Sequence, residues 1–144
     1  MTRVAIASLL AVAALAFAAP AFAAAVSDWS KSADRICART NADIDRIPDP
    51  DSTKTLISAT EKILELGKRQ TSDLAKLKRP SGAAATIAQL VGISEQQIGV
   101  IKTLIAALRR DDQVKAEAVV AQGNALESKA MALARKLGAK KCAE

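Results

Sequence analysis

The sequence predicts an all-α protein: an up-down-up-down antiparallel four-helix bundle preceded by a signal peptide. Aromatic residues make up only 2% of the chain, whereas the helix formers alanine, leucine and lysine are abundant. Between residues 87 and 108, mostly apolar residues recur in alternating steps of four and three, which is the spacing of a buried helix seam. Prolines and short polar turns then divide the remaining chain into segments of helical length.

The N-terminus has the features of a secretory signal peptide. Arg3 provides a short positive region, residues 4–19 form a long apolar run, and Pro20 interrupts it. Ala21-Phe22-Ala23 then gives the small-x-small pattern that signal peptidase recognises. We therefore predict cleavage after Ala23 and export to the periplasm or the cell exterior.

This assignment predicts a signal peptide of residues 1–23 followed by a single domain, a four-helix bundle of residues 24–144. An uncleaved membrane anchor is the alternative, because residues 4–26 are nearly long enough to cross a bilayer. The bundle domain is long enough for one modest hydrophobic core.

The first helix of the bundle is predicted to run from Ser27 to Ile47 and to be the shortest of the four. Ser27 is a favourable N-cap, and Asp28 complements the helix dipole in the first turn. Pro48 ends the helix, because a residue that precedes proline avoids helical angles. Its buried stripe is predicted to comprise Trp29, Ala33, Ile36, Cys37, Thr40, Ile44 and Ile47.

The second helix is predicted to begin after an N-cap at Asp51 or Ser52 and to run to about Lys78. A glycine at position 67 destabilises the helix by about 1 kcal/mol relative to alanine. We therefore predict that Gly67 allows a neighbouring helix to cross closely at this point. Gln70 is polar within the seam and therefore needs a partner. The whole seam comprises Leu56, Thr60, Ile63, Gly67, Gln70, Leu74 and Leu77.

A short turn at residues 79–82 leads into a third helix of residues 83–109, and such a short link favours antiparallel neighbours. Asp111-Asp112 is predicted to cap the fourth helix. Gly138 lies where a C′ glycine ends a helix. The fourth seam comprises Val119, Gly123, Leu126, Ala130, Leu133 and Leu137.

The chain has two cysteines, Cys37 and Cys142, and in an exported protein a disulfide is the default. Cys37 lies roughly 13 Å into the first helix. A tail that reverses at Gly138 reaches about 13 Å back toward it. The alternatives are a reactive thiol, an intermolecular bridge and a metal site, which is disfavoured because histidine and a third cysteine are absent.

Basic residues gather where the predicted helices end. One interpretation is that they complement the helix dipoles, and the other is an anion-binding surface. Helices two and four finish at the same end of the bundle, so their cations converge there. This predicted basic end comprises Lys76, Lys78, Arg79, Arg135, Lys136, Lys140 and Lys141. An envelope polymer or lipid surface suits it better than nucleic acid, because aromatic stacking residues are lacking.

The sequence offers no catalytic residues, metal ligands or cofactor motif. Without histidine there is no catalytic triad and no imidazole ligand, and no glycine-rich phosphate loop occurs. The aspartates at positions 43, 45, 49 and 51 do not fit a calcium loop, because prolines interrupt them and no glycine provides the sharp turn. We therefore predict that the protein is not an enzyme.

Several short motifs resemble those of an uncharacterised family of small exported helical proteins that is common in actinobacteria. They are Cys37-Ala38-Arg39-Thr40-Asn41, Ile44, Ile47-Pro48, Pro50, Pro80, Gly123-Asn124-Ala125, and Leu137-Gly138 before Cys142. The resemblance implies a helical bundle with a Cys37–Cys142 bridge and implies no activity. Many members of the family look lipid-anchored, but this chain lacks a cysteine directly after its apolar run.

These features favour a non-enzymatic protein of the cell envelope with a binding or structural role. Its expected partner is an anionic envelope component or a helical protein. The alternative is a carrier of a small apolar ligand, held in the bundle core between the first and fourth helices, where alanine and glycine replace bulky residues.

Overall fold

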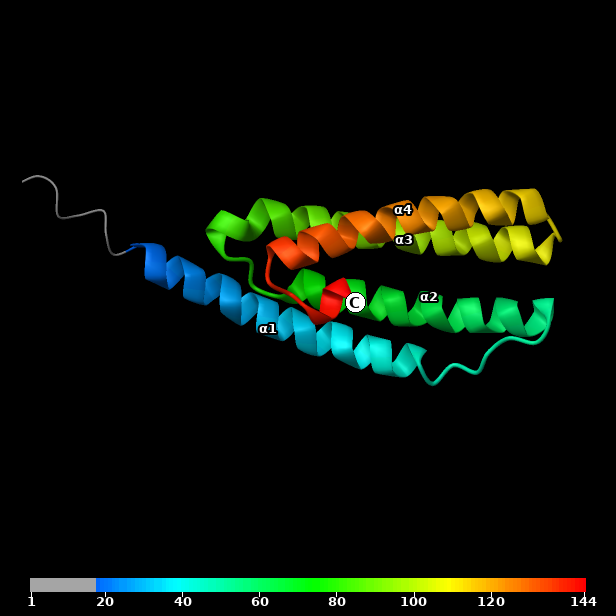
Figure 1. The fold of residues 1–144 in the computed structure, drawn as a ribbon, viewed down its shortest axis with the longest axis horizontal. Helices are drawn as coiled ribbons and strands as arrows, with labels where there is room; N and C mark the ends of the chain where they lie inside the picture. The colour runs from blue at the N-terminus through cyan, green and yellow to red at the C-terminus, as the bar shows by residue number, and fades with distance from the viewer. Residues whose placement is uncertain (1–17) are drawn as a thin grey trace, which may run out of the picture.

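The computed structural model describes residues 18–144 and confirms an all-α four-helix bundle. The helices are α1 (Ala18–Ile44), α2 (Thr53–Lys76), α3 (Ala84–Arg109) and α4 (Gln113–Lys136), with short 3-10 turns η1 (Ser81–Ala83) and η2 (Lys141–Ala143). Each helix runs antiparallel to the next along the chain (Figure 1). The predicted signal peptide lies mostly outside the described residues.

The boundaries of α1 differ from the prediction at both ends. The helix is already formed at Ala18, and the Ser30 hydroxyl donates to the Ser27 carbonyl at 2.9 Å, so Ser27 is an interior residue and not an N-cap. Alanine dominates the preceding residues and is the best helix former, which explains this extension. The helix then ends at Ile44, because residues 45–47 form a turn. The described α1 has 27 residues, and six of them, 18–23, belong to the predicted signal peptide. Its bundle part, residues 24–44, is shorter than α2, α3 and α4, as predicted.

The hydrophobic core is concentrated at the end of the bundle where α2 and α4 finish (Figure 1). From α1 the predicted stripe is buried as far as Thr40, whereas Ile44 and Ile47 are only partly buried. The cluster comprises Trp29, Ala33, Ile36, Leu74, Ala83, Ile87, Leu90, Val91, Ala134, Leu137 and Ala139. This end of the molecule is therefore the best-packed part of the described chain.

In α2, Ser52 is the N-cap of a capping box: its side chain accepts from the Thr55 N–H, and its backbone N–H donates to Thr55 Oγ1. The predicted close crossing at Gly67 is wrong, because a Cβ atom there would meet nothing within 4 Å. Gln70 does have a partner, since its Nε2 lies 3.4 Å from Cys37 Sγ. Leu64 is buried although the predicted seam omitted it.

Two helices end in Schellman motifs. In α4, Gly138 has φ +76°, its N–H donates to the Arg135 carbonyl at 3.0 Å, and the Ala139 N–H reaches the Ala134 carbonyl at 2.9 Å. In α3 the same role falls to Asp111, which has φ 55°. Asp112 then caps α4 by accepting from the Lys115 N–H at 3.0 Å, as predicted.

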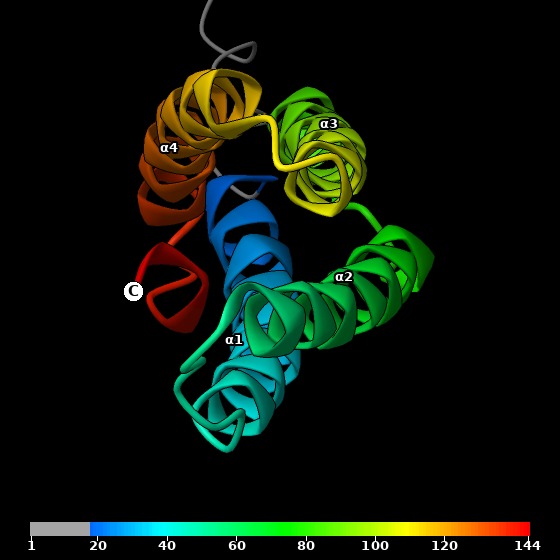
Figure 2. The same ribbon diagram turned by 90° about the vertical axis from the view of Figure 1, so that its right-hand side faces the viewer.

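The C-terminal tail lies between α1 and α4. The η2 turn contacts both helices, while each helix otherwise contacts its neighbour in the chain. Figure 2 shows the tail beside α1 on the side toward α4. The side of the bundle where a core ligand was predicted is therefore occupied by the chain's own tail.

Candidate functional site

The tail is joined covalently to α1. Cys37 and Cys142 form a disulfide across a sequence separation of 105, with Cα atoms 5.1 Å apart. Both cysteines of the chain are used in this bond. The predicted pairing is confirmed, and the closed loop includes most of the bundle.

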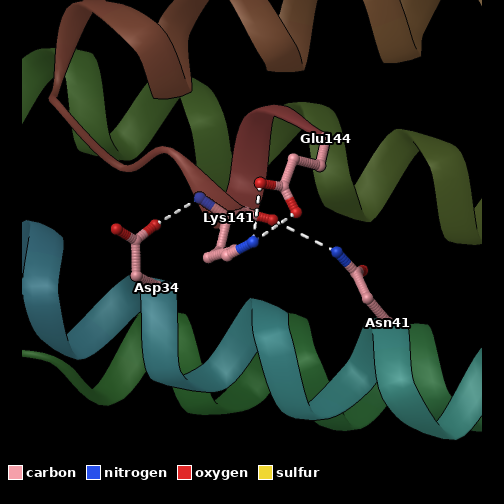
Figure 3. Close-up of polar contacts among 4 residues, drawn as sticks. All are labelled: Asp34, Asn41, Lys141 and Glu144. Atoms are coloured by element: carbon pink, nitrogen blue, oxygen red, sulfur yellow. Dashed lines mark hydrogen bonds and ion pairs between the residues drawn. The ribbon is translucent and has the colours of Figure 1, made fainter.

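Hydrogen bonds on either side of the disulfide fix the tail further (Figure 3). The Lys141 backbone N–H donates to Asp34 Oδ1 at 2.7 Å, and Asn41 Nδ2 donates to the Lys141 carbonyl at 3.2 Å. The Lys141 ammonium contacts both carboxylate oxygens of Glu144, at 2.8 and 2.9 Å. The hydrogen bond to Glu144 and then the charge of Glu144 raise the pKa of Lys141. Desolvation by burial opposes this increase, and the charge of Asp34 adds to it to a lesser extent.

The basic end is the end of the molecule at which α2 and α4 both finish (Figure 1). Two of its predicted members are paired. The Lys76 ammonium lies 3.6 Å from the Asp73 carboxylate, and Lys141 forms an ion pair with Glu144 in the tail beside α1. The other members are exposed and form no ion pair among residues 18–144. They are Lys78, Arg79, Arg135, Lys136 and Lys140.

Charges at the opposite end are mixed and locally compensated. Arg109 of α3 binds Glu61 of α2, and Arg46, in the turn after α1, lies 3.0 Å from Asp43 of α1. Asp111 and the N-cap Asp112 add negative charge at the α3–α4 link. The excess of positive charge therefore belongs to the end where α2 and α4 finish.

In the described chain, one hollow lies beside α1 near its C-terminal end and another lies near Trp29. The larger, of about 500 Å³, lies between the C-terminal half of α1 and α2, and charged side chains of both signs line it. The smaller, of about 320 Å³, lies between α1 and the α2–η1 link. We call it the Trp29 hollow; it is lined by Ala25, Asp28, Trp29, Ser32, Leu77, Lys78 and Pro80.

Trp29 is the only tryptophan of the chain, and it is buried, with 3% of its surface exposed. Its ring Nε1 is buried without a hydrogen-bond partner among the described residues. A buried donor without a partner destabilises a fold by about 1–3 kcal/mol. Sequence reasoning assigned Trp29 to the core and missed the hollow, because residues 77–80 approach it only through the fold.

Within residues 18–144, no group of three histidine, cysteine, aspartate or glutamate side chains is placed to hold a metal ion. No helix in that range is long and apolar enough to cross a bilayer.

The fold and the surface together define a class: a disulfide-closed four-helix bundle with one cationic end. Comparisons with known protein families, curated proteins and solved structures find no match to this chain. The resemblance to the actinobacterial family thus stays a prediction, and the candidate site is argued from geometry and charge alone.

Proposed function

We propose that this chain is an exported, non-enzymatic protein whose basic end binds an anionic component of the cell envelope. The observation that supports it most directly is the set of five exposed cations, at the end where α2 and α4 finish, that form no ion pair with any residue from 18 to 144. A surface of one sign attracts a polymer or lipid headgroup of the other over about 10 Å at 0.1 M salt.

Export is proposed on two grounds. The first 23 residues have the charge, apolar run and small-x-small pattern of a signal peptide. The Cys37–Cys142 disulfide is of the kind that persists in oxidising compartments. The family resemblance points the same way, toward small exported helical proteins.

The competing explanation of the cations is helix capping, because they lie in the last turn of α4 or shortly after the C-termini of α2 and α4, where positive charge complements the dipole. The two explanations differ in what they predict for binding. Capping alone predicts that affinity for a polyanion depends on total charge, wherever the cations lie. A binding surface predicts that it depends on these five positions.

The test compares two variants of equal charge by salt elution from a heparin or phosphocellulose column. In the first, Lys78, Arg79, Arg135, Lys136 and Lys140 are changed to glutamine. In the control, the same change is made at five exposed lysines elsewhere: Lys54, Lys62, Lys102, Lys115 and Lys129. We expect the first variant to elute at clearly lower salt than the control, with equal helix content by circular dichroism. Equal elution of the two would refute the proposal.

The alternative of an apolar ligand in the bundle core is the weaker proposal. Its predicted location was the space between α1 and α4, and the tail residues Ala139 and Cys142 pack on the core there. A ligand could enter that space only by displacing a segment that the disulfide holds in place.

A further inference from the structure

We propose that the Trp29 hollow is a binding site for a small anionic amphiphile, such as a short-chain carboxylate with an alkyl tail. This site is separate from the proposed contact with an anionic polymer, although Lys78 belongs to both. The hollow of about 320 Å³ is of the size that protein pockets use for small ligands.

The apolar part of such a ligand is matched by the lining. Ala25, Leu77, Pro80 and the indole of Trp29 present hydrocarbon and aromatic surface from two segments that meet only in the fold. An alkyl chain of a few carbons that enters the hollow would leave water on these surfaces, which favours binding in proportion to the apolar area covered.

The charge of the ligand is set by Lys78, which lines the hollow and forms no ion pair among residues 18–144. Asp28 also lines it, but its carboxylate lies 3.9 Å from the Lys31 ammonium and is largely exposed. The nearby Arg79 adds to the positive charge of the α2–η1 link. The local balance therefore favours an anionic group over a cationic one.

Trp29 connects the hollow to the core. Part of its surface lines the hollow, while the residue as a whole belongs to the core cluster. Its Nε1 is a buried donor that no described residue satisfies, and it is too buried to serve as evidence for a ligand in the hollow. The proposal therefore depends on the apolar lining and on the charge of Lys78.

The single tryptophan makes the proposal directly measurable, because all indole fluorescence of the chain comes from Trp29. The experiment titrates the purified protein, in its natural processed form, with octanoate, octanol and octylammonium below their aggregation limits. We expect a saturable change in Trp29 emission with octanoate, and binding of octanol and octylammonium at least threefold weaker. An absent response to octanoate, or equal binding of octanol, would overturn the proposal.

Variants then locate the site. Lys78→Gln should weaken octanoate binding by about two- to fivefold, as expected for one exposed cation–anion contact, and leave octanol unchanged. Lys102→Gln removes an exposed lysine of α3 outside the hollow and should leave octanoate binding unchanged. The same loss in both lysine variants would indicate a general charge effect and contradict the assignment.

A second set of variants fills the Trp29 hollow with a larger side chain. Ser32→Met should weaken octanoate binding more than tenfold, while Ser128→Met on the exposed face of α4 should not. Should Ser32→Met lose helix content, Ala25→Met fills the hollow from an exposed position. Octanoate binding that survives a folded filling variant would place the site elsewhere. Heparin retention should be unaffected by filling, so this proposal and the proposed function can fail separately.

Discussion

Asp111 and Gly138 occupy the same backbone conformation at the ends of consecutive helices, but only one of them suits it. Both have positive φ, 55° and 76°, and both provide the C′ position of a Schellman motif. Glycine adopts this conformation without a steric penalty, whereas a residue with a Cβ atom is disfavoured by about 1–2 kcal/mol. Asp111 is therefore a point of local strain at the α3–α4 link.

Replacing Asp111 by glycine should stabilise the protein. We expect Asp111→Gly to raise the free energy of unfolding by about 0.5–1 kcal/mol, because the gain from relieving the strain exceeds the extra freedom of glycine in the unfolded chain. Urea denaturation followed by circular dichroism measures it. Asp111→Ala is the matched control: it also removes the carboxylate but keeps the Cβ atom, and it should bring no gain. A gain of equal size in both variants would assign the effect to charge.

Replacing Gly67 by alanine and replacing Gly138 by alanine should change the free energy of unfolding in opposite directions. Gly67 lies within α2 with open space around its Cα, so Gly67→Ala should raise the free energy of unfolding by about 0.5–1 kcal/mol. Gly138 has φ +76°, and Gly138→Ala should lower the free energy of unfolding by about 1–2 kcal/mol. Melting temperatures measured side by side would reveal the two signs. A loss in Gly67→Ala would mean that α2 approaches a neighbour there after all.

At the scale of elements, the tail acts as a fifth packing unit. The η2 turn contacts α1 and α4, and it is held by the disulfide and by two hydrogen bonds to the backbone of Lys141. Because α1 otherwise packs mainly on α2, the tail supplies much of what attaches α1 to the rest of the bundle.

Removing the disulfide should therefore destabilise the protein strongly. We expect the double variant Cys37→Ala, Cys142→Ala to lose about 2–5 kcal/mol of unfolding free energy, in the range for a closed loop of about 100 residues. Asp34→Ala, which removes only the acceptor for the Lys141 N–H, should lose about 1 kcal/mol. Urea denaturation with and without a thiol reductant is the measurement. A wild-type curve that is unchanged by full reduction would contradict this view of the tail.

Most of the element pattern could be predicted from the sequence, because local chemistry decides it. The caps at Ser52 and Asp112 and the stop at Gly138 depend on residues within one helical turn. What could not be predicted depends on neighbours distant in sequence. Helical periodicity identifies a face but not its partner, so Gly67 was assigned to a crossing that does not exist.

The candidate site shows the same limit. Five members of the predicted basic end form no ion pair among residues 18–144. That they lie at the same end of the molecule could be predicted, because the up-down topology makes α2 and α4 finish there. The pairing of Lys141 with Glu144, on a tail that runs back along α1, depends on the path of a few residues. The Trp29 hollow was missed because residues 25–32 and 77–80 form it together.

At the scale of the whole molecule, burial is uneven along the bundle axis. The core cluster lies at the end where α2 and α4 finish, with contributions from all four helices and the tail. At the other end, α1 stops at Ile44 and an extended link crosses to α2 (Figure 1). Exposed apolar side chains, Leu56 and Val114, also belong to that far end.

Hydrogen exchange should follow this gradient. Amides of residues 29–40, 70–76 and 86–94 are expected to show the highest protection, close to that of global unfolding, because they surround the core cluster. Amides of residues 54–60 and 104–118, at the far end, should exchange through local opening at lower free energy. Native-state exchange measured by NMR or mass spectrometry distinguishes these cases. Uniform protection along the axis would show that the bundle opens only as a unit.

The long loop between the two cysteines has a consequence for the timing of biosynthesis. A ribosome adds about 5–20 residues per second, so the 105 positions between Cys37 and Cys142 correspond to roughly 5–20 s. Throughout that interval the earlier thiol has no native partner and can react with an oxidant or a foreign disulfide that it meets. Native covalent closure thus waits until Cys142 has been synthesised, and a ribosome that stalls before Cys142 leaves an uncrosslinked chain.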